Sequence, residues 1–166
     1  MKVYEAVAET LRRLGVNTTF GLVGSGNFGL IGHMKRHCGI GYHASRHEAA
    51  AVAMADGYAR VIGKLGVCTV HQGPGVTNTL TTLTEAVKAR TPLLLLAGDT
   101  ATTALYQNLD VDQDAVVASV GAATDGIRSA NTAVEDIARA VRRAIIERRP
   151  IVISLPSRSC SLDSSS

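Results

Sequence analysis

The feature of this sequence that most constrains its fold is the regular alternation of short apolar runs with longer stretches of helical periodicity. The clearest runs are residues 92–97 (Pro-Leu-Leu-Leu-Leu-Ala) and 151–155 (Ile-Val-Ile-Ser-Leu), a pattern typical of strands buried on both faces. Strands that alternate with helices indicate βα units and a parallel sheet. We therefore expect an α/β fold, a three-layer sandwich with a mostly parallel six-stranded sheet and helices on both faces.

The other elements are expected to continue this alternation. Three further strands are expected at Thr18–Val23, Ile40–His43 and Gly66–His71. Helices are expected at residues 4–14, 27–37, 46–61 and 76–89, and in a final helix with a buried face of Val134, Ile137, Ala138, Val141 and Ile145. Residues 98–132 have the weakest pattern, and we expect a loop there, with strands at Ala115–Val120 and near Gly126–Arg128.

Length and composition fit one domain. The chain has 166 residues, 46% of them hydrophobic, so residues 1–156 are expected to form a single domain. Residues 157–166 include six serines, and we expect this tail to be disordered. No apolar run approaches the roughly 18 residues of a membrane span, and we expect no membrane association. Three cysteines without a CxxC pair are typical of reduced thiols, so we expect a cytoplasmic protein.

The net charge of +3 is concentrated in the region of the final helix, where five arginines occur between residues 139 and 149. A surface that binds nucleic acid usually adds exposed aromatic residues for base stacking, and aromatic residues make up only 4% of this chain. We interpret the arginines as a solvated face and expect no nucleic-acid partner.

The segment Gly24-Ser25-Gly26-Asn27-Phe28-Gly29 matches the GxGxxG pattern of a dinucleotide-binding turn, and it follows an expected strand and opens an expected helix. That interpretation requires an acidic residue at the end of the second strand, about 20 residues on. The expected second strand ends in His43-Ala44-Ser45, without a carboxylate. An NAD-binding domain is therefore a weaker alternative, and the other interpretation is a glycine turn that brings the backbone close to another group.

The segment Ser45-Arg46-His47-Glu48 has two interpretations. Its S-x-x-E spacing is that of a capping box, in which the Ser45 hydroxyl accepts from the Glu48 amide and the Glu48 carboxylate accepts from the Ser45 amide. The helix that follows is almost all small and apolar (Ala49 to Ala55), which indicates close packing on several sides. A carboxylate at the start of such a helix is costly to bury without a partner. Glu48 is therefore also a candidate functional residue.

Other patterns of reactive residues are incomplete. His33 with His37, and His43 with His47, have the i, i+4 spacing of metal ligands, but the second pair straddles a strand–helix junction and the first lacks an acidic third ligand. Asp110, Asp112 and Asp114 resemble the opening of a calcium loop that has Ala115 and Gly121 where glycine and glutamate are required. Ser25 and Ser45 lack a nucleophile elbow. We therefore expect no metal site and no hydrolase chemistry.

Four segments occur together in a characteristic order and spacing: Phe20–Ser25 (FGLVGS), Arg46–Arg60 (RHEAAA…ADGYAR), Gly66–Asn78 (GVCTV…GPGVTN) and Pro150–Pro156 (PIVISLP). In this combination they resemble the N-terminal pyrimidine-binding domain of thiamine diphosphate enzymes, of the acetolactate synthase, benzoylformate decarboxylase and sulfopyruvate decarboxylase α-subunit type. The resemblance covers essentially residues 1–156.

The resemblance implies a cofactor and a mechanism. In this family the glutamate at the Glu48 position hydrogen-bonds N1′ of the aminopyrimidine, which promotes loss of the thiazolium C2 proton and attack on a 2-keto acid. It implies that Glu48 and His71 are catalytic, with His71 facing substrate, although a strand-end histidine bonded to the backbone is an alternative for His71. It also implies a cofactor-binding set of Val23, Gly24, Ser25, Glu48, Pro74 and Asn78.

The sequence departs from the family pattern in several places. Val23 replaces a proline, His71-Gln72 replaces Thr-Ser, and either Gln107 or Gln113 corresponds to the glutamine of an F-Q-E segment. The G-D-G…N motif that holds diphosphate and Mg2+ is absent, since Gly98-Asp99-Thr100 lacks the second glycine. These two groups would therefore be held by a partner domain.

Two hypotheses follow from the resemblance. In the first, the chain is one subunit of a two-chain decarboxylase or synthase, active on a 2-keto acid with a diphosphate-binding partner. In the second, it is a solitary or truncated domain that dimerises without catalysis. In both we expect a homodimer, formed through the helices at 46–61 and 76–89.

Overall fold

All strands of the computed structural model, which describes residues 2–98 and 111–155, belong to one sheet. The sheet has six strands in the order β2-β1-β3-β4-β6-β5, and every neighbouring pair is parallel. The strands are β1 (Thr18–Gly21), β2 (Gly41–Ala44), β3 (Gly66–Val70), β4 (Leu93–Gly98), β5 (Ala123–Gly126) and β6 (Pro150–Leu155). The α/β class is therefore confirmed, and the sheet is parallel throughout.

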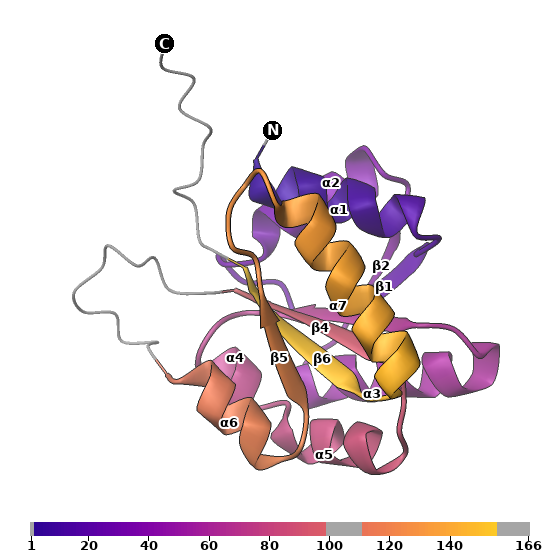
Figure 1. Cartoon of the computed structure of the whole chain (residues 1–166), viewed down its shortest axis with the longest axis vertical. Coiled ribbons are helices and arrows are strands. Elements are labelled where there is room, and N and C mark those ends of the chain that lie inside the picture. The colour runs from indigo at the N-terminus through magenta and orange to yellow at the C-terminus, as the bar shows by residue number, and fades with distance from the viewer. Residues whose placement is uncertain (1, 99–110, 156–166) are drawn as a thin grey trace.

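Seven helices in the described residues cover the two faces of the sheet (Figure 1). On one face lie α1 (Val3–Arg13), α2 (Phe28–Arg36) and α7 (Ala133–Glu147). The other face carries the remaining four helices, which are α3 (Glu48–Ile62), α4 (Pro74–Thr77), α5 (Leu80–Lys88) and α6 (Gln113–Ser119). None of the helices in the described ranges is both long enough and apolar enough to cross a bilayer.

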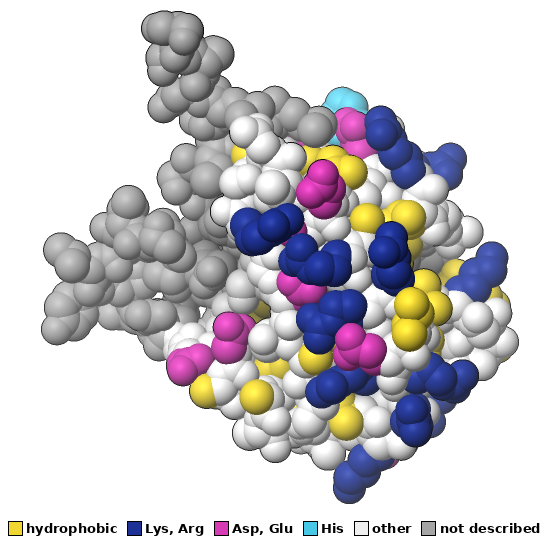
Figure 2. Space-filling view, in the orientation of Figure 1, with side chains coloured by type: hydrophobic (Ala, Val, Ile, Leu, Met, Phe, Trp, Pro, Cys, Tyr) yellow, Lys and Arg dark blue, Asp and Glu magenta, His cyan; other side chains and the backbone are white. Residues whose placement is uncertain are grey.

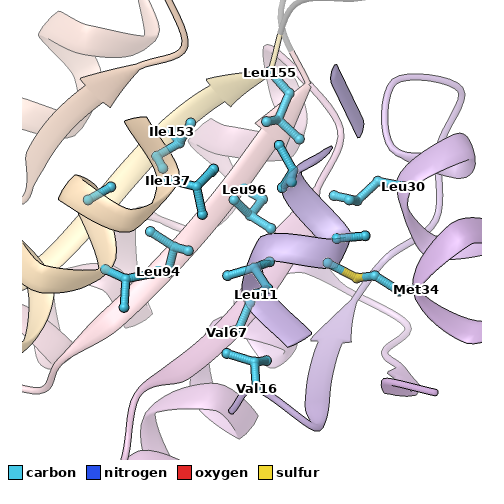
Figure 3. Close-up of a cluster of buried hydrophobic side chains, with 14 of the residues drawn as sticks. Leu11, Val16, Leu30, Met34, Val67, Leu94, Leu96, Ile137, Ile153 and Leu155 are labelled. Carbon is cyan, nitrogen blue, oxygen red and sulfur yellow. The ribbon is translucent and has the colours of Figure 1, made fainter. Parts of the chain in front are cut away.

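Two clusters of buried side chains hold the layers together, one on each face of the sheet. Alternate residues of a strand point to opposite faces, so the four leucines of β4 divide between the clusters. Leu94 and Leu96 join Leu11 and Ile137 under α1 and α7 (Figure 3), whereas Leu93 and Leu95 pack toward α3 and α5. The apolar runs 92–97 and 151–155 are thus central strands buried on both faces, as the sequence predicts.

Close packing of α3 on the sheet depends on a glycine. A Cβ atom at Gly66, the first residue of β3, would collide with the backbone carbonyl oxygen of Ala55 in α3. The small residues Ala51, Ala55 and Ala59 of α3 are buried at this contact. The alanine-rich sequence of α3 is therefore explained by close contact between a helix and a strand.

The sequence-based assignment of residues 98–132 was wrong in part. Residues 115–120, expected as a strand, belong mostly to helix α6, for which Asp112 is the N-cap and accepts a hydrogen bond from the amide of Ala115 at 2.9 Å. The strand expected near Gly126–Arg128 occurs earlier, as β5. Residues 99–110, which include Asp110 and Gln107, and the tail 156–166 lie outside the described residues.

The final helix buries only part of the face that was expected, with Ala138 partly buried. Ile137 and Val141 are buried, but Val134 and Ile145 are 40% and 51% exposed. The buried face is completed by small residues and by Asp136, whose side chain is 1% exposed. Arg139 bonds Asp136 and Asp125, and Arg143 bonds Asp125 and Glu147, so these two arginines form ion pairs and are not simply a solvated face.

Candidate functional site

The candidate residues gather at one edge of the sheet, the carboxyl edge, where the parallel strands end. The turn at residues 24–26 follows β1, Glu48 follows β2, and His71 follows β3. Because β1 lies between β2 and β3, these three connections are neighbours in space. Ligands of open α/β sheets commonly bind in this position, outside the carboxyl ends of the strands.

Glu48 is held by one side-chain hydrogen bond. It is the first residue of α3 and is half-buried, and its Oε2 accepts from Nδ2 of Asn78 at 3.0 Å. Asn78 ends the short helix α4, which follows β3. Within the described ranges no donor bonds Oε1 of Glu48, so one carboxylate oxygen is fixed and the other is free to accept a bond from a ligand.

The capping-box interpretation of Ser45 and Glu48 is wrong. The N-cap of α3 is His47, whose Nδ1 accepts from the amide of Ala49 at 3.1 Å. Ser45 is buried, and its hydroxyl donates to the carbonyl oxygen of Gly21 at 3.1 Å, which ties β2 to β1. Glu48 therefore has no capping partner in Ser45, and its side chain is directed by Asn78.

His71 lies against the glycine turn that follows β1. Its Nδ1 accepts a hydrogen bond from the backbone amide of Gly26 at 3.3 Å. A Cβ atom at Gly24 would be 3.0 Å from the His71 Cβ, and one at Gly26 would be 2.7 Å from its Nδ1. Both glycines thus leave room for the histidine, which is half-buried and bonded to the backbone.

Gly75 connects the two halves of the site. A Cβ atom here would lie 3.3 Å from the Cβ of His71 and 3.9 Å from Oε1 of Glu48. The absence of a side chain at this residue keeps the space between them open. The sequence signal is the glycine-proline-glycine run at residues 73–75 within the segment Gly66–Asn78, but it does not single out Gly75 as the residue that connects the site.

Buried amides hold the loops around this site. Asn27 accepts from the amide of Gly24 at 2.7 Å and donates to Thr69, so it fixes the glycine turn to β3. Gln113 accepts from the amide of Gly73 at 3.0 Å and donates to the carbonyl oxygen of Gly98. In the sequence, Gln113 is only one of two possible counterparts of a family glutamine, and Asn27 has no signal beyond its place in the glycine turn.

The other expected binding residues lie at the rim of the candidate site. Val23, Ser25 and Pro74 are exposed, with Val23 at 51%. Ser25 lines a cavity of about 900 Å3 together with Gly26 and Gln72, and this cavity extends along α1 and α2. The structure therefore groups Glu48, Asn78, Gly24 and His71 around Gly75, while the other three residues border this group.

The histidine pairs have other partners. The rings of His33 and His37 are in contact, with centroids 4.8 Å apart and planes tilted by 33°, and His33 Nε2 lies 3.6 Å from a Glu9 oxygen. His43 stacks on Phe20, and His47 is the cap of α3. The parts of the chain that the structure describes contain no group of three or more histidine, cysteine or acidic side chains placed to hold a metal.

The NAD-binding interpretation is not supported by the topology. The dinucleotide-binding fold has the strand order 3-2-1-4-5-6, whereas this sheet begins β2-β1-β3-β4. The glycines of the turn are explained by the side chains of His71 and Gln72, which pack against them. No carboxylate ends β2.

Comparison with known proteins gives a consistent family. Residues 1–119 match the family described as thiamine pyrophosphate enzyme, N-terminal TPP binding domain. A probable 2-ketoarginine decarboxylase of Pseudomonas aeruginosa is 37% identical over 92% of this chain, and the acetolactate synthase large subunit of Lactococcus lactis is 31% identical over 96%. The chain spans about 28% of the length of each of these two relatives.

A solved structure is similar over nearly the same range. The thiamine diphosphate-dependent 4-hydroxybenzoylformate decarboxylase of Rhodococcus jostii RHA1 superposes with a TM-score of 0.84 at 26% identity. The match covers 94% of this chain and 30% of that one. Fold, motifs and comparisons agree: this chain belongs to the family of N-terminal, cofactor-binding domains of thiamine pyrophosphate enzymes.

Proposed function

We propose that this chain is the pyrimidine-binding half of a thiamine diphosphate-dependent 2-keto acid decarboxylase or acetolactate synthase-like enzyme, in which Glu48 activates the cofactor. The observation that carries the proposal is the geometry of Glu48. One carboxylate oxygen is held by Asn78, and the other faces the gap left by Gly75. A carboxylate fixed in this way is suited to hold a proton between itself and a ring nitrogen.

The residues at the carboxyl edge fit an aminopyrimidine. The free oxygen of Glu48 can accept a hydrogen bond from the protonated form of N1′, and Gly24 and Gly75 have no side chains that would block a planar ring. Val23, Ser25 and Pro74 would border the ring. When bound, thiamine diphosphate supplies a nucleophilic carbon and an electron sink for decarboxylation. The protein holds the ring and controls the proton at Glu48.

His71 is the second catalytic residue of the proposal. Its Nδ1 is occupied by the Gly26 amide, so its Nε2 is the atom left to exchange a proton with substrate. This bond also fixes the plane of the ring, and the alternative that we noted, a strand-end histidine bonded to the backbone, is compatible with that role. The proton transfer therefore depends on the glycine turn after β1.

Activity requires a second polypeptide or domain in this proposal. The G-D-G…N motif that holds the diphosphate and Mg2+ is absent from this sequence. The chain spans only about 28% of full-length relatives. The partner would face the carboxyl edge, because the pyrimidine and diphosphate ends belong to one cofactor molecule.

The test is reconstitution. This chain is mixed with thiamine diphosphate, Mg2+ and a candidate diphosphate-binding chain that contains the G-D-G…N motif, and release of CO2 from 2-keto acids is measured. We expect turnover that falls by about a hundredfold or more in Glu48→Gln, since that change removes the proton acceptor. Glu135→Gln, at an exposed position of α7, is the matched control and should retain full activity.

Two results would contradict this proposal. Undiminished turnover by Glu48→Gln would remove Glu48 from the mechanism. The absence of turnover with the partner, together with unchanged folding of both chains, would favour the alternative of a solitary domain that dimerises without catalysis.

The proposal includes a homodimer through α3 and α5. Ala50, Ala53, Gly57 and Val61 form an exposed, small and apolar stripe along α3, with Val61 at 84% exposure. We expect sedimentation equilibrium to give a dimer for the wild-type chain and a monomer for Ala53→Arg, because a large charged side chain would separate the two stripes. Lys35→Arg, on α2, is the control, and a dimer that survives Ala53→Arg would exclude this interface.

A further inference from the structure

A small apolar cavity lies at the amino edge of the sheet, opposite the edge that carries Glu48. Its volume is about 280 Å3. It lies between the end of α1, the last turns of α7 and the segments that lead into β1, β3 and β4. Its apolar walls are Leu14, Val16, Leu65, Pro92, Val141 and Ile145.

Exposed apolar side chains surround this cavity. The described residues expose eight large hydrophobic side chains, and Leu14 and Ile145, at 47% and 51%, line the cavity itself. Ile62 follows the cavity residue Tyr58 by one turn of α3 and is 50% exposed, and Ile146 adjoins Ile145 at 72%. Half of these hydrophobic side chains therefore gather at one edge, and such clustering marks interaction surfaces.

The unpaired charges around the cavity are positive, since Glu147, next to Ile146, is ion-paired with Arg143 and Arg149. Lys64 is the only charged residue on its wall, and Arg13 and Arg142 adjoin the wall residues Leu14 and Val141. All three are exposed, and none forms an ion pair within residues 2–98 and 111–155. Figure 2 shows dark-blue basic side chains next to yellow apolar ones on the face that includes α7, together with some magenta acidic side chains.

We propose that this amino-edge patch, formed by Leu14, Ile62, Ile145 and Ile146 with Lys64, Arg13 and Arg142, binds an acidic amphipathic segment of a second polypeptide. One apolar side chain of that segment fills the cavity, and its carboxylates face the three unpaired cations. Burial of apolar surface supplies affinity, and complementary charge selects the partner.

The positive charge of the patch argues against a second copy of this chain as its occupant. A second copy of this chain would bring the same three cations against each other, which disfavours a symmetric contact. The patch also lies on the opposite edge from Glu48, so a bound segment would leave the proposed cofactor site open. Binding at this patch is therefore compatible with a diphosphate-binding chain at the carboxyl edge.

The experiment uses fluorescence anisotropy with a labelled helical peptide of leucines on one face and glutamates on the other. A matched peptide has lysine in place of every glutamate. We expect saturable binding of the acidic peptide and no binding of the lysine peptide. The double substitution Leu14→Ser with Ile145→Ser should weaken binding of the acidic peptide at least about tenfold, because it removes apolar side chains at the cavity. Lys64→Glu with Arg142→Glu should abolish acidic-peptide binding and allow the basic peptide to bind.

The control variants are Val134→Ser, an exposed apolar residue at the other end of α7, and Lys35→Glu on α2, both of which should bind like wild type. Equal binding of the two peptides, or equal loss in the controls, would overturn the proposal. A wild-type dimer that Ile145→Ser dissociates would assign the patch to a second copy, and Ile145-dependent binding to phosphatidylglycerol vesicles without peptide binding would assign it to a membrane. Either result would also overturn it.

Discussion

At the scale of single residues, the candidate site is organised by glycines that leave space for particular side chains. Gly24 and Gly26 accommodate His71, and Gly75 separates His71 from Glu48. The functional side chains are few, and each has at least one fixed bond: Asn78 to Glu48, and the Gly26 amide to His71. Substitutions at the glycines should therefore report on the site as directly as substitutions of the catalytic candidates.

We expect Gly26→Ala to lower the free energy of unfolding by about 1–3 kcal/mol, because the new methyl group would lie 2.7 Å from His71 Nδ1 and force the ring to move. Gly126→Ala, at the end of β5, is the matched control. Nothing lies within 4 Å of a Cβ atom there, and alanine restricts the unfolded chain by about 0.4–1 kcal/mol relative to glycine, so this variant should be at least as stable as wild type. Urea unfolding followed by circular dichroism measures both, and equal stabilities would contradict the close approach of His71.

At the scale of elements, the connection between β5 and α7 is stabilised by a buried carboxylate. Burial opposes ionisation of Asp136, but bonds from the Arg128 amide, the Thr132 hydroxyl and the guanidinium groups of Arg139 and Arg128 outweigh it and hold its pKa well below the ordinary value. This network joins the start of α7 to the loop that precedes it.

A depressed pKa in the folded state makes stability depend on pH. The contribution of Asp136 is fully present above the pKa of an unfolded aspartate, about 3.9, and is lost as the pH falls toward the folded value. We expect Asp136→Asn to be less stable than wild type by about 2–4 kcal/mol at pH 7 and to show a weaker loss of stability between about pH 5 and 2. The neighbouring Glu135→Gln, at an 80% exposed side chain, should retain the wild-type pH profile in denaturation experiments.

Most elements could be predicted from hydrophobic periodicity, because their buried residues follow a regular pattern along the sequence. Strands β3, β4 and β6 are apolar runs with glycine or proline at or near their ends, and their boundaries agree with the expected ones within about one residue. Glu48 at the start of a helix and His71 at the end of a strand agree with the expected elements. These signals are local, so the sequence alone contains them.

The errors occurred where local sequence is ambiguous. The run Ala115-Val116-Val117-Ala118 has the β-branched residues of a strand, but its helix is set by the Asp112 cap and by burial of Val117 against the sheet. In α7 the spacing of the valines and isoleucines gave a misleading prediction of the buried face, because Asp136 lies on the buried side of the helix. The bond from Ser45 to Gly21 joins two strands 24 residues apart, a contact that no local pattern reveals.

At the scale of the whole molecule, the two hydrophobic clusters share one sheet. Leu83 is buried on the α5 side and Ile137 on the α7 side, and both pack on β3, β4 or β6 residues of their own cluster. A loss of packing on either side therefore weakens the same central strands.

We expect Leu83→Ala and Ile137→Ala each to lower stability by about 2–5 kcal/mol and each to keep a single cooperative transition. Helical circular dichroism and tyrosine fluorescence should give coincident midpoints in both variants. Ile146→Ala, at a 72% exposed position of α7, is the control and should unfold like wild type. Two separate transitions in either core variant would show that the two clusters unfold independently.

The order of strands also has a consequence for how the chain acquires its structure during synthesis. Strand β6 is synthesised after the other five strands of this sheet, yet it lies between β4 and β5 and bonds to both. Until residues 150–155 emerge, β5 has no neighbour in the sheet and β4 has one open edge. Every strand pair is parallel, so no hairpin can form early, and formation of the sheet must wait for contacts distant in sequence. A stalled nascent chain that lacks β6 would therefore expose the open edge of β4 and the whole of the unpaired strand β5 to chaperones or to other nascent chains.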